Sequence, residues 1–329
     1  MSRFKHRKGK KPVVLICSAL SSRNTMTGMD FFAVVAARLS QNLASNYDLV
    51  IKVPFEDYNV ASQNYLIQSV LERASEFSGI ILVPIDTDSI KDEIIKFLKQ
   101  KPDYPLCTFD LGYSPDDKDF DGVPPPFVKV NGKHGGECAA EALDYYFKNK
   151  RINAPCVYIL KGMKSSEERI SGFNNKIASL FKGAEKIFET RAIPWEREKA
   201  EYEVTSILEL MKTSKLGYYV NAFFCCNDEM ALGTRDALVK FEKNNKDYFN
   251  KNPRIKIVGF DGIRDVTIHL DSKDPWIMNT VVVHLENQLQ ELAHKIEQMI
   301  EQKKPYKEVE SYQQNCTLYI QDVRNQYID

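Results

Sequence analysis

Residues 223–233 read FFCCNDEMALG, a bulky apolar run that stops abruptly at polar residues. The run at 222–226 is typical of a buried parallel strand. Asn227 or Asp228 is able to cap a helix that begins there, and Glu229 places an acid in its first turn, where the helix dipole favours it. Ligands of open α/β sheets bind at the carboxyl ends of strands. The stretch therefore predicts a strand, a polar edge and a helix, and its polar residues are either plain caps or ligand contacts.

Short apolar runs alternate with helical periodicities along the whole chain. The expected strands are 13–17, 49–54, 79–85, 105–109, 127–130, 156–160, 187–193, 222–226, 255–260, 276–283 and 316–320. A length of 329 residues suits two domains. We therefore predict an α/β protein with two similar Rossmann-like lobes, each built on a parallel sheet.

Composition argues against several classes of protein. Lys plus Arg and Asp plus Glu both number 45, so the overall charge does not favour nucleic acid or an anionic membrane surface. No apolar stretch approaches the ~20 residues of a membrane span. Seven scattered cysteines indicate a reducing compartment, and residues 13–20 lack the cleavage site of a signal peptide. The sequence as given predicts a cytoplasmic protein, or a periplasmic or cell-envelope protein if a leader has been removed.

Catalytic motifs are missing from the sequence. There is no G-x-S-x-G, no cysteine beside a histidine and no metal-ligand spacing, so we expect no enzyme, no metal and no cofactor. The triplet of Asp86 and Asp88, taken with His134, suggests a metal-dependent transferase or hydrolase, but a helix follows it and capping explains the acids. Glycines at 131–136 lack nucleotide-binding spacings, so we expect them to allow tight helix packing.

Isolated polar residues follow successive strands of the predicted sheets. These candidate ligand contacts are Ser18, Asn24, Asp110, Arg169, Trp195, Asn227 and Asp261. Carboxylates and amides bond several hydroxyls, an arginine offers a planar fork, and a tryptophan covers an apolar ring face. Each residue taken singly is better explained as a cap or turn residue than as a ligand contact. Together they suit a small polyhydroxylated ligand held between two lobes.

Two motifs resemble a known family. Residues 227–233 followed by IVGFDG at 257–262 are similar to the paired signature of the ribose-binding-protein branch of type I periplasmic binding proteins, which the effector domains of lac-repressor-like regulators share. The interval between them is longer here, by an insertion around 244–251. Residues 169–173 resemble the family's R-x-x-G-F segment, and residues 107–110 resemble its strand that ends in a ligand-binding aspartate.

The resemblance implies roles for individual residues. Arg169, Asn227, Asp261 and Asp110 would contact the ligand, and Trp195 would cover a sugar ring, while Asp228 and Glu229 would keep the capping role. This chain departs from the family in three places of the first-lobe pocket. Leu111 replaces an arginine, residues 22–25 replace paired aromatics, and Val283 replaces a glutamine, with His284 beside it as a further candidate contact. The resemblance therefore does not predict ribose itself.

Three linking strands are also implied. They divide the chain into a basic tail at 1–11, an N-terminal lobe at 12–130 plus 284–312, and a C-terminal lobe at 131–283 plus 313–329. The lobes would close over a ligand by hinge motion.

Two functions remain open at this point. The first is the sugar-binding component of an ABC-type importer, whose partner is a membrane permease. The second is an intracellular or membrane-linked sensor without its own DNA-binding domain, because about eleven residues before the first strand cannot form a helix-turn-helix. We expect no nucleic-acid partner and a monomer rather than a dimer.

Overall fold

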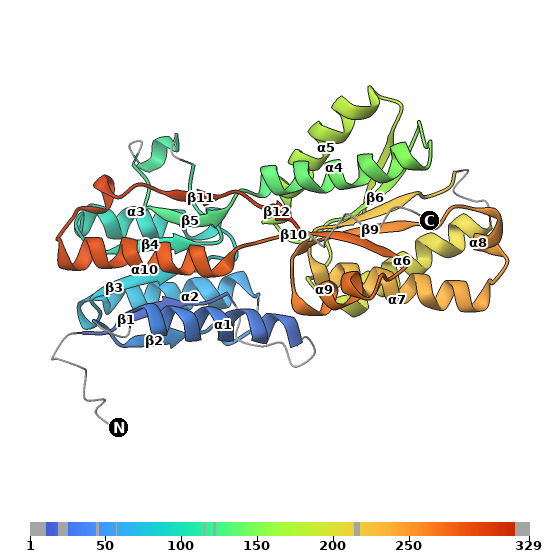
Figure 1. Ribbon diagram of the computed structural model, residues 1–329. Helices are drawn as coiled ribbons and strands as arrows, with labels where there is room; N and C mark the ends of the chain where they lie inside the picture. Colours follow the sequence, from blue (N-terminus) through green and yellow to red (C-terminus); the bar gives the residue numbers. More distant parts are fainter. Residues whose placement is uncertain are drawn as a thin grey trace. The chain divides into compact units, whose positions relative to one another are not determined.

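The structure is a computed structural model in which residues 11–18, 26–43, 46–56, 58–114, 116–120, 123–213 and 218–319 are described. The chain divides into two compact units (Figure 1). Unit 1 holds Met1–Val130 and His284–Gln314, and unit 2 holds Asn131–Val283 and Asn315–Asp329. Each unit contains one six-stranded sheet.

Unit 1 has a fully parallel sheet in the order β11-β5-β4-β3-β1-β2. Its strands are β1 (Val13–Ile16), β2 (Leu49–Lys52), β3 (Gly79–Leu82), β4 (Leu106–Phe109), β5 (Phe127–Val130) and β11 (Tyr312–Gln314). Its helices are α1 (Met26–Leu43), α2 (Val60–Glu72), α3 (Lys91–Gln100) and α10 (Leu285–Glu301), with short 3-10 turns at Ala74–Glu76, Asp88–Ile90, Lys118–Phe120 and Tyr306–Glu308. Helix α10 packs beside α1 and on β3, β4 and β5, although it lies far from them in sequence.

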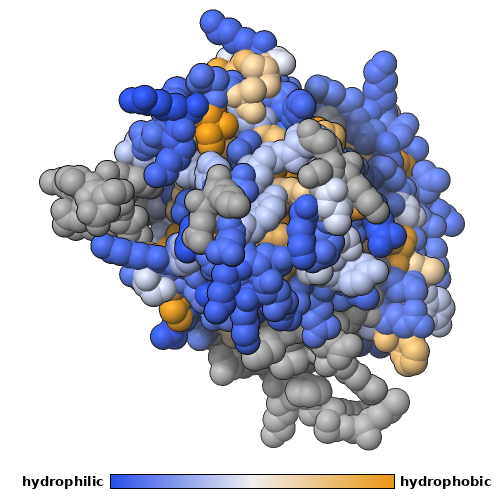
Figure 2. All heavy atoms as spheres, turned by 90° about the vertical axis from the view of Figure 1, so that its right-hand side faces the viewer, coloured by the Kyte–Doolittle hydropathy of each residue, from blue (hydrophilic) through white to orange (hydrophobic). Residues whose placement is uncertain are grey.

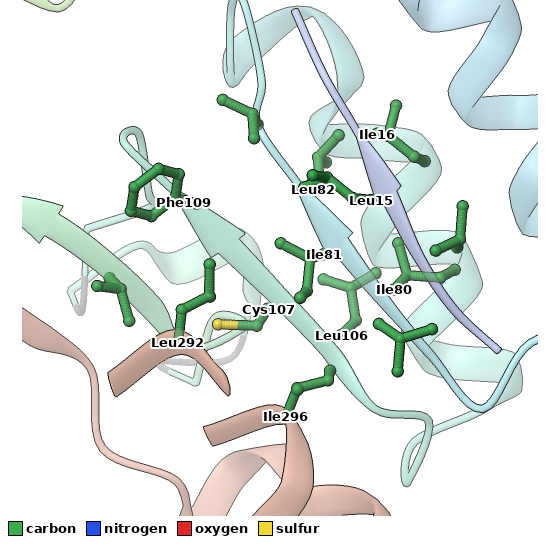
Figure 3. Close-up of a cluster of buried hydrophobic side chains, with 14 of the residues drawn as sticks. Leu15, Ile16, Ile80, Ile81, Leu82, Leu106, Cys107, Phe109, Leu292 and Ile296 are labelled. Atoms are coloured by element: carbon green, nitrogen blue, oxygen red, sulfur yellow. The ribbon is translucent and has the colours of Figure 1, made fainter. Parts of the chain in front are cut away.

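The core of unit 1 explains the apolar strands. Strands β1, β3 and β4 are buried along their whole length, as central parallel strands require. Figure 3 shows Leu15, Ile81 and Cys107 of these strands in one cluster with Leu292 and Ile296 of α10. The helical spacing of α10 thus places its apolar face against the sheet.

Unit 2 repeats this arrangement in the order β12-β10-β9-β8-β6-β7, with only the β10–β12 pair antiparallel. Its strands are β6 (Cys156–Leu160), β7 (Lys186–Glu189), β8 (Ala222–Cys225), β9 (Lys256–Asp261), β10 (Ile277–Val282) and β12 (Thr317–Leu318). Its helices are α4 (Gly132–Asn149), α5 (Ser166–Phe181), α6 (Arg197–Lys212), α7 (Asp228–Asn244), α8 (Tyr248–Lys251) and α9 (Arg264–Asp271). Helices α4 and α5 cover one face of the sheet, and α6, α7 and α9 cover the other (Figure 1).

The predicted fold class is confirmed, with differences at the ends of elements. The strand expected at 187–193 is β7 and ends at Glu189. The chain passes between the units after Val130, Val283 and Gln314, so the third passage lies two residues beyond the expected one. The reason is that β11 continues to pair with β5 as far as Gln314.

The insertion around 244–251 folds onto unit 2 through aromatic contacts. It contains α8, where Tyr248 meets Phe241 edge to face at a centroid distance of 5.3 Å. Phe249 meets Trp276 at 5.0 Å in the same manner. Aromatic pairs of this geometry stabilise beyond their buried area. The insertion therefore packs against the core of unit 2 through the partly exposed rings of Tyr248 and Phe249.

Cysteines behave as small apolar residues in both units. All seven lie within the described ranges and are free and buried. Burial raises the pKa of the Cys17 and Cys107 thiols to about 12. The interpretation of Cys17, Cys107, Cys156, Cys225 and Cys226 as buried hydrophobes is confirmed.

The surface is predominantly polar where it is visible. Figure 2 shows a hydrophilic face on which apolar side chains form small separate groups. Among the described residues, no helix is both long enough and apolar enough to traverse a bilayer.

Two glycines set the distance between α4 and α5. A Cβ at Gly136 would collide with the carbonyl oxygen of Arg169, and a Cβ at Gly172 would collide with that of Lys133. The backbones of the two helices therefore touch, which confirms tight packing as the reason for the glycines near 131–136. This contact fixes the start of α5, where Arg169 lies.

We predict that Gly172→Ala destabilises the protein. At an exposed helix position this change stabilises by about 1 kcal/mol, but here overpacking against Lys133 should lower the free energy of unfolding by about 1–3 kcal/mol. Urea unfolding followed by circular dichroism measures the change. The control is Ser171→Ala at the exposed neighbouring position, expected within ~0.5 kcal/mol of wild type. A Gly172→Ala protein as stable as wild type would contradict the packing argument.

Candidate ligand-binding site

Arg169 is the centre of a polar cluster in unit 2. It lies in the first turn of α5 and is 7% exposed. Its Nη1 donates to the carbonyl oxygen of Cys226 and lies 3.5 Å from Oδ1 of Asp261. Its Cζ lies 3.9 Å from the ring centroid of Phe260. The guanidinium thus contacts the carboxyl ends of both β8 and β9.

The hydrogen-bonding capacity of Arg169 is only partly used. Nε is buried and has no partner, and no described residue accepts a hydrogen bond from Nη2. A guanidinium carries five N–H donors, and a buried charge is costly unless it is paired. The guanidinium of Arg169 therefore has a fixed position in the cluster and N–H donors that make no hydrogen bond to another described residue.

Trp195 lies beside this arginine. Its ring centroid is 5.6 Å from Cζ of Arg169. The indole also packs against Gly162, just past the end of β6, where any side chain would overlap it. A half-buried indole held in this way presents a flat apolar face next to polar donors.

Asn227 performs the capping that the sequence analysis assigned to its neighbours. Its Oδ1 accepts a hydrogen bond of 2.8 Å from the backbone N–H of Met230, so Asn227 is the N-cap of α7. The assignment of this cap to Asp228 is wrong, because the Asp228 side chain turns toward β9 and β10 instead. The amide Nδ2 of Asn227 makes no hydrogen bond to another described residue, so one side chain is able to serve both as cap and as donor.

Asp228 is a fully buried carboxylate. It accepts hydrogen bonds from the backbone N–H of Ile263 at 2.8 Å and from Oγ1 of Thr280 at 2.7 Å. Burial raises its pKa well above the usual range, and the nearby charge of Asp261 adds to this rise. Sequence reasoning missed this role, although a second acid behind the capping residue was a visible signal.

Asp261 ends β9 with an unusual backbone conformation. Its φ is 119°, which side-chain-bearing residues rarely adopt. Its side chain is 35% exposed and faces Nη1 of Arg169. Asp110 follows β4, the equivalent strand of unit 1, and also has a positive φ of 69°. Each unit thus ends the corresponding strand with Phe-Asp in a strained turn, at Phe109-Asp110 and Phe260-Asp261.

The other predicted residues lie in unit 1 or outside the described chain. Ser18 follows β1 and is buried, at the same carboxyl edge of the sheet as Asp110. His284 precedes α10, and its side chain is exposed. Asn24 lies outside the described residues. The structure therefore gathers Arg169, Trp195, Asn227 and Asp261 in unit 2 and places Ser18 and Asp110 at the matching edge of unit 1.

Gln63 is a further residue of unit 1 that sequence reasoning missed. It is 1% exposed, and its Nε2 donates to the carbonyls of Cys17 at 3.0 Å and Val83 at 2.8 Å. Its Oε1 accepts from the N–H of Ile85. It thereby fixes the carboxyl ends of β1 and β3. A polar residue in register with Ile67 and Val70 on the buried face of α2 was the signal for it.

The acids of the Asp86 triplet act as turn residues. The Asp86 carboxylate accepts from the N–H of Asp88 at 3.2 Å, and its carbonyl accepts from Oγ of Ser89. Within the described ranges, no group of three His, Cys, Asp or Glu side chains is arranged to hold a metal ion. The expectation that these acids cap the helix is wrong, because the N-caps of the 3-10 turn Asp88–Ile90 and of α3 are Thr87 and Ile90, and neither makes a side-chain cap hydrogen bond.

The two-unit α/β fold and the cluster at the strand ends define a ligand-binding protein of the periplasmic type. A family model described as "Periplasmic binding protein domain" matches residues 24–304, and the chain belongs to this family.

Solved structures with the same fold are similar along nearly the whole chain. One is an ABC transporter periplasmic solute-binding protein of Actinobacillus succinogenes with bound D-allose, with a TM-score of 0.74, 19% identity and coverage of 95% of this chain and 98% of that one. Another is the myo-inositol-binding protein of Caulobacter, bound to myo-inositol, with a TM-score of 0.74, 18% identity and coverage of 96% and 95%.

A curated relative belongs to a different functional class. It is the probable HTH-type transcriptional repressor ExuR of Bacillus subtilis, 25% identical over 245 residues. The match covers 72% of this chain and 61% of that protein, so the chain spans less than two thirds of its relative.

We predict that the two roles of Asn227 separate by mutation. Asn227→Ala should lower the free energy of unfolding by about 1 kcal/mol, because the N–H of Met230 loses its acceptor. Asn227→Ser should keep near wild-type stability, since a hydroxyl also caps. Thermal and urea unfolding measure both changes. If the serine variant were as unstable as the alanine variant, the capping role would be wrong.

Proposed function

We propose that this protein binds a neutral sugar or polyol and serves as the solute-binding component of an ABC-type importer. The observation that carries the proposal is the guanidinium of Arg169, which is buried, held on Phe260 and left with unused donors. Ligand hydroxyls supply acceptors of the right geometry for such a fork. The role is binding rather than catalysis, and it uses no cofactor and no metal.

Charge supports a neutral ligand. Arg169 and Asp261 offset each other, with Nη1 and Oδ1 3.5 Å apart. A carboxylate ligand would add a negative charge beside Asp261, and an ammonium would add a positive charge beside Arg169. Hydroxyls avoid both costs, because they donate to Asp261 and accept from Arg169 and from Nδ2 of Asn227.

The two units would act as lobes that close on the ligand. In this proposal unit 2 contributes Arg169, Asn227 and Asp261, with Trp195 against a ring face. Unit 1 contributes Asp110 and Ser18, together with Asn24 and His284. The three chain passages between the units form the hinge. Closure is favoured because only the closed form lets both sets of side chains meet the ligand.

The relatives support this class of ligand. The two similar solved structures are solute-binding proteins with D-allose and with myo-inositol, both neutral polyhydroxylated rings. By this analogy the partner is a membrane permease. We further propose that the protein acts as a monomer.

A second candidate function is ligand sensing. The curated relative is a probable transcriptional repressor, so the same binding fold would here signal to a partner instead of delivering solute. Cell fractionation of the native gene product separates the two functions. Recovery in the envelope fraction supports import, and recovery with the cytosol supports sensing.

A calorimetric panel tests the binding proposal. At least one of D-allose, myo-inositol and other neutral monosaccharides and polyols should bind, and the uronic acid matched to the tightest-binding aldose should bind at least roughly tenfold more weakly. The Arg169→Ala, Asp261→Ala double variant should bind the tightest-binding ligand with an affinity lower by about 100-fold or more, because two charge-assisted hydrogen bonds to the ligand are lost.

Arg191→Ala is the matched control for this panel. Arg191 also lies in unit 2, but its side chain is 78% exposed, and its Nη2 lies 3.9 Å from Oε2 of Glu203, which makes a weak surface ion pair. Its removal should therefore leave affinity unchanged. Equal binding by the double variant and wild type would refute the assigned site. Binding of no neutral polyol at all would refute the ligand class.

A further inference from the structure

We infer that Asp228 is a positioning residue, which holds the ligand-contacting Asp261 in its strained conformation through the backbone of the following two residues. This inference deepens the proposed function and rests on it for the ligand contact of Asp261. The geometry that supports it lies entirely within unit 2.

The first step is the set of hydrogen bonds at the Asp228 carboxylate. Oδ2 accepts from the N–H of Ile263 at 2.8 Å. Oδ1 accepts from Oγ1 of Thr280 in the adjacent strand β10 at 2.7 Å. One side chain thus joins the N-terminus of α7, the turn after β9, and β10.

The second step is the strain in the turn that these bonds hold. Asp261 has a φ of 119°, and Gly262 follows with a φ of 75°. A non-glycine residue in such a region persists only where surrounding structure determines it. Asp228 accepts the N–H of Ile263, two residues after Asp261, so Asp228 opposes relaxation of the turn.

The third step is the room made for the carboxylate. Gly259 in β9 faces Oδ1 of Asp228, and any Cβ there would overlap this oxygen. The same aspartate is 0% exposed, so solvent does not compete for its hydrogen bonds. A buried acid with this many protein donors is not explained by helix capping, because Asn227 already caps α7.

The consequence concerns the distance between Asp261 and Arg169. Asp261 faces Nη1 of Arg169 at 3.5 Å only while the turn keeps its conformation. If the turn relaxes to a negative φ at Asp261, the carboxylate leaves the guanidinium and the ligand together. Asp228 therefore acts on the ligand through Asp261, without touching it.

Hydrogen exchange tests the positioning without any ligand. In Asp228→Ala, peptides spanning 260–264 should exchange roughly tenfold faster or more, because the N–H of Ile263 loses a buried acceptor. Asp228→Asn should retain protection, since its amide oxygen accepts from the N–H of Ile263 and its NH2 donates to the Thr280 hydroxyl. Thr280→Val removes only the bond to Oδ1 and serves as the milder variant if Asp228→Ala does not fold. Unchanged exchange at 260–264 in folded Asp228→Ala, or in Thr280→Val if only that variant folds, overturns the inference.

A double-mutant cycle tests the path through Asp261. With the tightest-binding neutral polyol of the panel, Asp228→Ala should weaken binding at least about tenfold in the wild-type background. In an Asp261→Asn background, the same change should weaken binding less than about twofold, because the contact it supports is already impaired. Thr280→Val should show the same dependence on background with a smaller effect.

The outcomes of the two experiments are distinguishable. Equal weakening in both backgrounds means that Asp228 has only a general structural role, and the inference fails. If wild type binds no polyol, the proposed function fails, and hydrogen exchange alone decides whether Asp228 holds the turn.

Discussion

A permanent positive charge buried among strand ends is the constraint on which unit 2 depends. Arg169 cannot lose its charge, so its surroundings must compensate it. They do so with the carbonyl of Cys226, the carboxylate of Asp261 and the ring face of Phe260. A cation on a desolvated ring contributes up to about 2 kcal/mol, which offsets part of the burial cost but leaves hydrogen bonds unmade.

The rest of the arrangement follows from placing that guanidinium. Gly136 and Gly172 bring α4 and α5 into backbone contact, which fixes where α5 begins. Gly162 leaves space for the indole of Trp195 beside the arginine. The side chain of Asp228, buried behind β9, holds the turn that carries Asp261. Residues around the cluster thus determine where the side chains of Arg169, Trp195 and Asp261 lie.

The internal similarity of the two units gives a physical reason for the paired aspartates. The two sheets have corresponding strand orders, and Asp110 and Asp261 follow corresponding strands, β4 and β9. Both residues have positive φ, so both turn away from the strand direction at its carboxyl end. Such a turn presents a carboxylate at the edge where α/β sheets bind ligands.

The sequence alone predicted the fold well because apolar runs and helical spacing are local signals. It located the buried cysteines and every strand except β11 (Tyr312–Gln314) from such patterns, and the short polar β11 carries no apolar run. It misassigned the cap of α7, since Asn227 and Asp228 are both good capping residues and only tertiary contacts with Ile263 and Thr280 decide between them. It missed Gln63 because the partners of this side chain, Cys17 and Val83, are distant in sequence.

The most direct test of this account is a crystal structure with the neutral polyol that binds most tightly. The account predicts ligand hydroxyls within hydrogen-bond distance of Nη2 of Arg169, Nδ2 of Asn227 and the Asp261 carboxylate, with a ring face against Trp195 and Asp261 still at positive φ. A ligand bound elsewhere, or one that leaves Arg169 without a contact, would contradict it.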